Sequence, residues 1–218
     1  MWWNMSTEMR AEFEDWHSHE HFPERLGIPG FLRSSRWCAA DGGAGVFVLY
    51  ELEDHGILSS PAYLERLNDP TPWTRKLMPH HTDMMRSQSR VLASWGGLTA
   101  LCAMTLRFVS GETGDRRAFC SAIRGVLAGL AARRGLVGVH LLEHEAPSIE
   151  QTAEQKIRGV PDRFAELVVL VTAYDETALR TLTSTDLSVA SLRALGANKP
   201  PSPNYFLLSH CALPPDVQ

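Results

Sequence analysis

The stretch FEDWHSHEHFPERLGIPGFLRSSRW, residues 13–37, decides the topology of the first half of the chain. Phe13, Trp16 and His17 recur at three- and four-residue spacing, which predicts one face of a helix. Pro23 lacks a backbone N–H, so this helix is expected to kink or end there. A proline-glycine turn and a β-rich run follow, and together they predict a strand after the helix.

Outward from this stretch, the periodicity predicts a βαββαβ order. The hairpin at 31–53 turns at a Gly-Gly pair, and Ser60 with Pro61 is typical of a helix N-terminus. The expected elements are a strand at 2–6, a helix at 10–22, two strands within 31–53, a helix at 60–69 and a closing strand at 84–95.

The same order recurs in the second half. We expect strands at 98–109, 136–145, 166–175 and 203–213, with helices at 115–135 and 176–196. The simplest account is two tandem repeats, residues 1–96 and 97–218, which meet at Gly96-Gly97. Each repeat would form an antiparallel sheet with helices on one face. The predicted class is therefore α+β, with two sheets able to close toward an α/β barrel around a pocket.

Composition narrows the classes of partner. The chain has 218 residues, a formal net charge of -4, and hydrophobic and charged fractions of 44% and 21%. These values are typical of soluble globular proteins and give no basic footprint for nucleic acid or an anionic membrane. Neither a membrane-length apolar run nor a secretory leader pattern is found, so a cytoplasmic location is expected.

Several cofactor and catalytic motifs are absent from the sequence. The four cysteines form no C-x-x-C pair, and we interpret them as reduced, half-buried residues. The Gly-rich dinucleotide and triphosphate loops and the G-x-S-x-G elbow are missing as well. The sequence therefore does not indicate a Rossmann-type cofactor, a nucleoside triphosphate site or a serine hydrolase.

The first half resembles the EthD-like branch of the dimeric α/β-barrel, or ferredoxin-like, superfamily. The resemblance rests on residues 9–92 and is carried by His21, Pro23 and the Pro29-Gly30 step. It implies a ferredoxin-like fold with a small-molecule pocket and a possible homodimer. The superfamily includes cofactor-free oxygenases, cyclases, isomerases and haem enzymes, so the resemblance indicates fold more narrowly than function.

Residues 17–21 contain H-x-x-E-H, a spacing found in one class of zinc peptidases. His17 and His21 could chelate a first-row metal, but Pro23 interrupts the helix and no third ligand is marked. We predict instead that His21 is an acid/base or substrate-binding residue, because the pKa of imidazole lies near working pH. A structural role at a helix end is the alternative. His17 and Trp16 are the expected neighbours in a substrate pocket.

A second set of candidates follows Pro72. By the resemblance, His80 corresponds to a histidine after a proline, and Arg75 nearby could orient an anionic or carbonyl substrate. Tyr63 and Trp73 could cover the mouth of the pocket, or could be ordinary core aromatics. The alternative for His80 and Arg75 is a solvated loop.

In the second repeat, His140 alternates with apolar residues and could line the pocket, although a hydrogen-bonded structural histidine is the alternative. The polar run at 148–164 is typical of a lid or a contact surface. We therefore predict a small-molecule pocket protein, either an enzyme without cofactor using His21 with His80 or Arg75, or a non-catalytic accessory protein of a catabolic pathway. A metal or haem enzyme is the third reading.

Overall fold

The chain folds as two units, each assembled from segments that are discontinuous in sequence. The computed structural model describes residues 1–159 and 163–217. Unit 1 comprises Met1–Gln88, Ala146–Arg163 and Ser209–Gln218, and unit 2 comprises Ser89–Glu145 and Phe164–Leu208. Unit 1 therefore takes in a segment that lies between two strands of unit 2.

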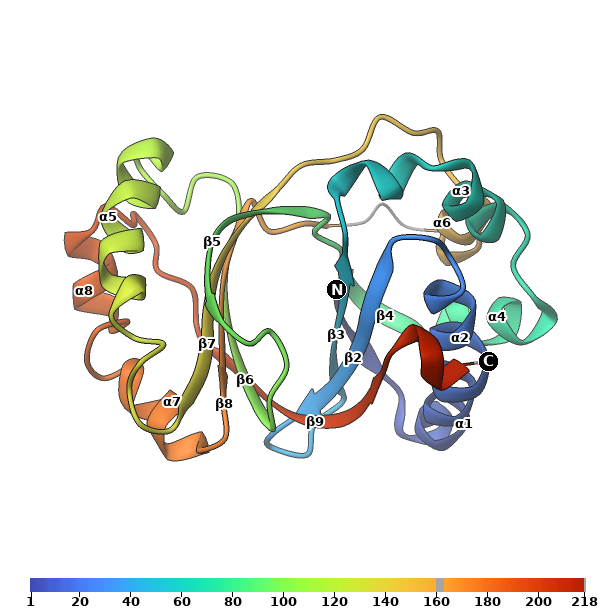
Figure 1. The fold of residues 1–218 in the computed structure, drawn as a ribbon, viewed down its shortest axis with the longest axis horizontal. Helices are drawn as coiled ribbons and strands as arrows, with labels where there is room; N and C mark the ends of the chain where they lie inside the picture. Colours follow the sequence, from blue (N-terminus) through green and yellow to red (C-terminus); the bar gives the residue numbers. More distant parts are fainter. Residues whose placement is uncertain (160–162, 218) are drawn as a thin grey trace. The chain divides into compact units, whose positions relative to one another are not determined.

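Unit 1 has the strand order β4-β1-β3-β2, with β9 beside β2. The pairs β1–β3, β1–β4 and β2–β3 are antiparallel, and the helices lie on one face of the strands (Figure 1). Its elements are β1 (Trp2–Met5), η1 (Thr7–Met9), α1 (Arg10–Trp16), η2 (His17–His21), α2 (Phe22–Leu26), β2 (Phe31–Ala39), β3 (Gly45–Leu52), η3 (His55–Ser59), α3 (Pro61–Asn68), α4 (Pro72–Leu77), η4 (Met78–His80), β4 (His81–Met85), α6 (Ala153–Arg158) and η5 (Pro214–Val217).

Unit 2 repeats this topology with the order β9-β6-β8-β7-β5. Its helices also lie on one face of the strands (Figure 1). Its elements are β5 (Ser89–Gly96), β6 (Cys102–Phe108), α5 (Arg116–Ala128), β7 (Leu136–His144), β8 (Leu167–Ala173), α7 (Glu176–Leu182), α8 (Val189–Ala194) and the first part of β9 (Asn204–Ala212). The predicted class, α+β with ferredoxin-like βαββαβ topology and antiparallel sheets, is confirmed.

The closing strands differ from the sequence prediction. The single strand expected at 84–95 is two strands, because β4 pairs with β1 in unit 1 whereas β5 pairs with β7 in unit 2. In the same way β9 pairs with β6, while its residues 209–212 belong to unit 1. In the nine-stranded order, β5 covers the edge of β7 and β9 lies between β2 and β6, so the edges that they cover do not expose unpaired backbone groups. The division of the sequence into repeats 1–96 and 97–218 stays a prediction. The two folded units have other boundaries, because each combines segments that are separated in the sequence.

Glycine is required where β5 ends against β7. Gly96 has φ of +76°, and a Cβ there would lie 2.0 Å from the Val137 carbonyl oxygen. A Cβ on Gly138 would lie 2.1 Å from the Gly97 carbonyl oxygen. No side chain fits at either separation, so Gly96 and Gly138 allow the two backbones to approach.

Each unit has its own apolar core between its strands and helices. In unit 1 the core includes fully buried aromatic side chains from α1 and α2, among them Phe13, Trp16 and Phe22. In unit 2 it is mainly aliphatic, since every residue of β8 is buried and α5 contributes Phe119, Ile123 and Leu127. The aromatic content of the unit 1 core is the feature that sets up its candidate site.

Two further elements differ from the expected ones. The region around Pro72 contains the short helix α4, because the Thr71 hydroxyl accepts a hydrogen bond from the Thr74 N–H at 3.0 Å and caps it. The polar run at 148–164 contains α6. Thr152 is the N-cap of this helix and forms a capping box with Gln155. Part of this run, residues 160–162, lies outside the described residues.

Candidate functional site

The helix that carries H-x-x-E-H widens into a π-helical turn, η2 (His17–His21), and then continues as α2 beyond Pro23. A proline ring in an α-helix would clash with the carbonyl four residues earlier, which here belongs to His19. The wider turn, in which the Phe22 N–H donates to the His17 carbonyl, accommodates the proline without ending the helix. The predicted break at Pro23 is therefore a bulge, and such bulges occur frequently at functional sites.

His17 and His21 lie together in an aromatic environment. Their ring centroids are 5.3 Å apart, the His21 ring lies 4.5 Å from Trp16, and the His17 ring lies 4.3 Å from Phe22. Both side chains are buried, with 1% and 5% of each residue exposed. The Nδ1 atoms of both rings have no hydrogen-bond partner among the described residues. The nearest charge to His21 Nδ1 is a Glu24 carboxylate oxygen at 3.9 Å.

A third imidazole, His81, joins this group from the start of β4. Its ring centroid lies 5.0 Å from Trp3, 5.8 Å from Phe13 and 6.0 Å from Trp16. Its Nδ1 is 3.0 Å from the Leu77 carbonyl oxygen, which orients the ring. We call His17, His21 and His81 with Trp3 and Trp16 the imidazole–tryptophan cluster.

All three imidazoles of the cluster are neutral at physiological pH. Burial lowers the pKa of His17 and of His21 well below the usual value. The neighbouring imidazole of His21 further disfavours protonation of His17, and the Arg25 guanidinium does the same for His21. Burial lowers the pKa of His81 to about 4, although its hydrogen bond to the Leu77 carbonyl opposes the shift. A neutral imidazole with an unbonded nitrogen can accept a proton or a hydrogen bond.

These shifts make stability depend on pH. Between about pH 4 and the usual value of 6.5, the unfolded chain binds protons at His81 that the folded protein does not, so the free energy of unfolding falls as pH falls. For His81 we expect a loss of about 2 kcal/mol between about pH 7 and about pH 5. Urea unfolding at several pH values measures it. The variant His81→Gln should have a flatter profile, and an unchanged slope in that variant would contradict the assignment.

Glu20, the acidic residue of H-x-x-E-H, is hydrogen-bonded to residues other than the two histidines. Its carboxylate accepts a hydrogen bond from Trp16 Nε1 at 2.9 Å, and others from the hydroxyls of Thr71 and Thr74 at the start of α4. It therefore joins η2 to α4 and is not available as a co-ligand of the two histidines. Among residues 1–159 and 163–217, no group of three or more His, Cys, Asp or Glu side chains could hold a metal ion.

A zinc site uses three or four protein ligands, and the described residues do not bring a third ligand to His17 and His21. Haem iron needs only one axial imidazole, and the unbonded Nδ1 atoms of His17 and His21 have suitable chemistry for it. In that case one of these two residues would hold the iron, and the haem would supply oxygen or redox chemistry.

A buried ion pair lies beside the cluster. Arg25 of α2 donates through Nη2 to the Glu154 carboxylate of α6, and both side chains are over 90% buried. Tyr63 lies under Arg25, with the guanidinium carbon 5.9 Å from its ring centroid, and its hydroxyl accepts from Arg86 at 2.7 Å. The segment that precedes β8 thus contributes to the polar surroundings of the cluster.

The predicted site residues divide into two sets. His17, His21 and Trp16 lie together. Tyr63 contacts Arg25, which follows on the same helix. His80 is exposed, and the adjacent His81 is the buried member of that pair. Arg75 is exposed and bonds the Pro70 carbonyl at 3.0 Å, and Trp73 bonds Glu12 at 3.3 Å, so neither joins the cluster.

His140 belongs to unit 2 and is fully buried there. Its ring nitrogens lie 2.8 Å from the Ser94 hydroxyl and 3.2 Å from the Gly97 carbonyl oxygen. Burial lowers its pKa below the usual value. These bonds attach β7 to the end of β5, which corresponds to the structural alternative for this residue.

Sequence reasoning missed His81, Arg25 and Glu154. His81 stands next to His80 and differs from it only in the direction imposed by the start of β4. Arg25 and Glu154 are 129 residues apart, and neither lies in a recognisable motif. Strand alternation would not have indicated His81, because Thr82 and Asp83 are both exposed and the next buried residue is Met84. No local signal could have paired Arg25 with Glu154.

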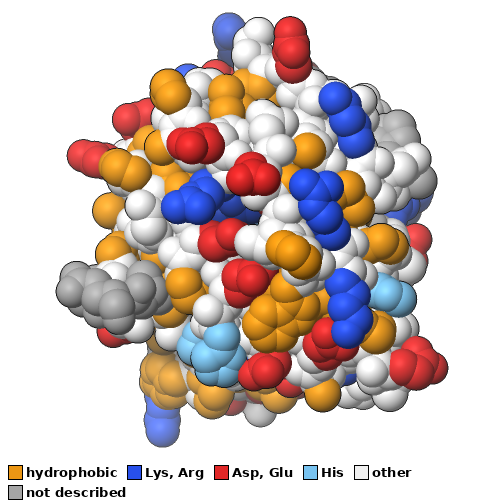
Figure 2. All heavy atoms as spheres, turned by 90° about the vertical axis from the view of Figure 1, so that its right-hand side faces the viewer, with side chains coloured by type: hydrophobic (Ala, Val, Ile, Leu, Met, Phe, Trp, Pro, Cys, Tyr) orange, Lys and Arg blue, Asp and Glu red, His pale blue; other side chains and the backbone are white. Residues whose placement is uncertain are grey.

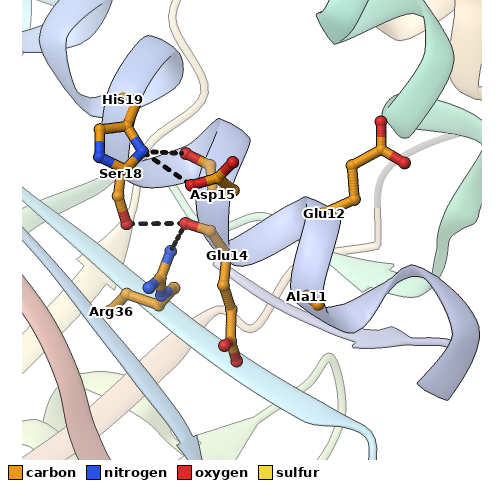
Figure 3. Close-up of a pocket in the computed structure, with 7 residues that line it drawn as sticks. All are labelled: Ala11, Glu12, Glu14, Asp15, Ser18, His19 and Arg36. Carbon is orange, nitrogen blue, oxygen red and sulfur yellow. Dashed lines mark hydrogen bonds and ion pairs between the residues drawn. The ribbon is translucent and has the colours of Figure 1, made fainter.

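The outer face of α1 carries a wide, open groove of about 640 Å³, shown in Figure 3. Its lining residues are Ala11, Glu12, Glu14, Asp15, Ser18, His19 and Arg36. The polar groups bond within the groove, since Ser18 Oγ and Arg36 Nη1 both donate to the Glu14 carbonyl and His19 pairs with Asp15. The buried imidazole–tryptophan cluster differs from this groove, because the Nδ1 atoms of His17 and His21 have no such partner among the described residues.

The helical side of unit 1 presents charges of both signs. Figure 2 shows acidic and basic side chains interspersed over this face, with apolar side chains between them. An interspersed pattern creates no field of one sign for steering a polyanion. No helix in the described part of the chain is long and apolar enough to cross a membrane.

No family model and no curated protein matches the sequence. Solved structures do match it. An anthrone oxidase-like protein superposes with a TM-score of 0.63 at 12% identity, covering 100% of this chain and 92% of that one.

This chain has the same fold as the anthrone oxidase-like protein.

Two candidate monooxygenases superpose in the same way. One, from Fusobacterium nucleatum, has a TM-score of 0.60 at 7% identity over 97% of this chain and 91% of that one. The other, from Lactobacillus acidophilus, has 0.56 at 10% over 98% and 93%. These similarities support the ferredoxin-like fold, and the narrower EthD-like resemblance is not confirmed by them.

Proposed function

We propose that unit 1 contains the active site of a small-molecule enzyme, in which His21 removes a proton from an aromatic, carbonyl-bearing metabolite without a cofactor. The observation that carries this proposal is the pair of buried, neutral imidazoles with unbonded Nδ1 atoms among aromatic rings. A buried polar atom without a partner is costly in a native protein, so each such atom calls for an explanation. A bound substrate would supply the missing partner.

The chemistry of the cluster suits this reaction. The lowered pKa keeps the His21 imidazole unprotonated near neutral pH, so its free nitrogen is available to accept a proton, and an apolar site strengthens interactions with a developing charge. The rings of Trp3, Trp16 and Phe22 pack against the imidazoles and give the site apolar, aromatic surroundings. His17 is the proposed second contact to the substrate, and His81 the residue that holds Trp3 and Trp16 in place. His80 and Arg75, being exposed, are left out of the proposal.

Oxidation by dioxygen is the second candidate. It is favoured by the similar structures named as monooxygenases or as anthrone oxidase-like. A CH₂ group beside a carbonyl, once deprotonated, can add O₂ to give a hydroperoxide, and loss of water from it leaves a ketone. This sequence needs no external reductant, and its first step is the proposed proton transfer.

The test is deuterium exchange. The protein is incubated with 1-tetralone in buffered D₂O, and NMR follows the loss of the proton signal next to the carbonyl. General-base catalysis predicts exchange about a hundredfold above the buffer blank. Binding of tetralone without exchange would support the non-catalytic accessory protein instead. Oxygen uptake with anthrone, measured in parallel, tests the oxidative continuation.

A further inference from the structure

A second group of unpartnered polar atoms lies between α2 and the β2–β3 hairpin. Arg25 Nη1, Ser34 Oγ and the Tyr50 hydroxyl are buried and have no hydrogen-bond partner among the described residues. Arg25 and Ser34 are 3% and 0% exposed. Each unsatisfied buried group calls for an explanation, and a ligand that contacts these three atoms would supply one.

These atoms adjoin the imidazole–tryptophan cluster. Ser34 and Tyr50 are register partners on neighbouring strands, so their side chains project from the same face of the sheet. The Tyr50 ring lies 5.8 Å from Phe22, and Phe22 in turn lies 4.3 Å from His17. Arg25 follows His21 by four residues along the helix. The two groups of unpartnered atoms are thus joined through Phe22 and the helix.

The charges of this region favour one kind of ligand atom. Arg25 pairs with Glu154 through Nη2, so its positive charge is already balanced in the free protein. Burial raises the pKa of Tyr50, which keeps its hydroxyl protonated and able to donate. Two donors around a balanced ion pair suit a neutral ketone or phenol oxygen that gains charge only during reaction, rather than a permanent carboxylate.

We propose that Arg25 Nη1 and the Tyr50 hydroxyl form an oxygen-binding subsite for an aromatic ketone or phenol, with Ser34 as a third polar contact. This rests on the proposed function of the cluster. When a substrate C–H proton passes to His21 Nδ1, the electron pair of that bond moves into the carbonyl and forms an enolate. The enolate oxygen then accepts hydrogen bonds from Arg25 and Tyr50.

Binding of simple probes tests this subsite. Quenching of tryptophan fluorescence gives the Kd of 2-naphthol, naphthalene and 1-naphthoate. We expect 2-naphthol to bind best, and Tyr50→Phe to weaken its binding about tenfold while leaving naphthalene unchanged. The same variant should unfold at no lower urea concentration, because it removes a hydroxyl that has no partner. The matched control is Tyr63→Phe, whose hydroxyl is bonded to Arg86 and should affect stability more than naphthol affinity.

A double variant, Arg25→Gln with Glu154→Gln, removes the charge but keeps a hydrogen-bonded pair, and it should also weaken 2-naphthol binding. Equal naphthol affinity in wild type and Tyr50→Phe would overturn the subsite, as would tighter binding of 1-naphthoate than of 2-naphthol. If tetralone exchange still depends on His21 in that case, the proposed function is kept and only the oxygen-binding subsite is rejected. No binding of any probe together with no catalysed tetralone exchange would overturn both proposals.

Discussion

Replacing His21 with glutamine is expected to lower the rate of tetralone exchange about a hundredfold, to the rate of the buffer blank, because a general base typically contributes at least this factor. Glutamine has a similar length and can form hydrogen bonds, but it cannot accept a proton near neutral pH. Because His21 Nδ1 makes no hydrogen bond in the protein, little native bonding is lost in the substitution. NMR exchange measurements with each variant give the rates, and urea unfolding shows whether the fold is kept.

The control for this variant lies on the same helical turn. His19 is exposed, with 73% of its side chain accessible, and pairs with Asp15 on the outside of the helix. His19→Gln should leave the exchange rate unchanged. If His19→Gln lowers the rate as much as His21→Gln, or if neither does, His21 is not the base.

Removing the Glu154 carboxylate is expected to cause the largest loss of stability. Glu154→Ala leaves the buried Arg25 guanidinium without its partner, and such broken pairs cost about 3–5 kcal/mol in the free energy of unfolding. The double variant Arg25→Met with Glu154→Leu removes both charges and should recover most of that loss, since buried ion pairs can be exchanged for apolar residues at little cost. Urea unfolding of the wild type, of Arg25→Met, of Glu154→Leu and of the double variant gives the coupling energy.

An exposed ion pair provides the comparison. Arg180 and Glu176 pair at 2.6 Å on the surface of α7, four residues apart. Glu176→Ala should cost less than about 0.5 kcal/mol, because solvent screens the pair. Equal effects of Glu154→Ala and Glu176→Ala would show that the segment with α6 does not stabilise unit 1 through Arg25.

Much of the fold was predictable because its signals are local. The strands alternate or run apolar, and Ser60 caps α3 as its side chain and the following proline predicted. The β2–β3 hairpin turns at the expected glycines. The candidate site was predictable only where its residues share one helix, as His17, His21 and Trp16 do.

The sequence by itself determined the βαββαβ order, the antiparallel sheets and the histidine-bearing helix, since periodicity, caps and turns act within a few residues. Only the tertiary structure decided the rest. Pro23 widens the helix instead of ending it, His81 and not His80 turns inward, and Glu154 reaches Arg25 from a segment inserted far along the chain. These outcomes depend on packing between distant segments, and which buried polar groups find partners is decided there and not by neighbouring residues.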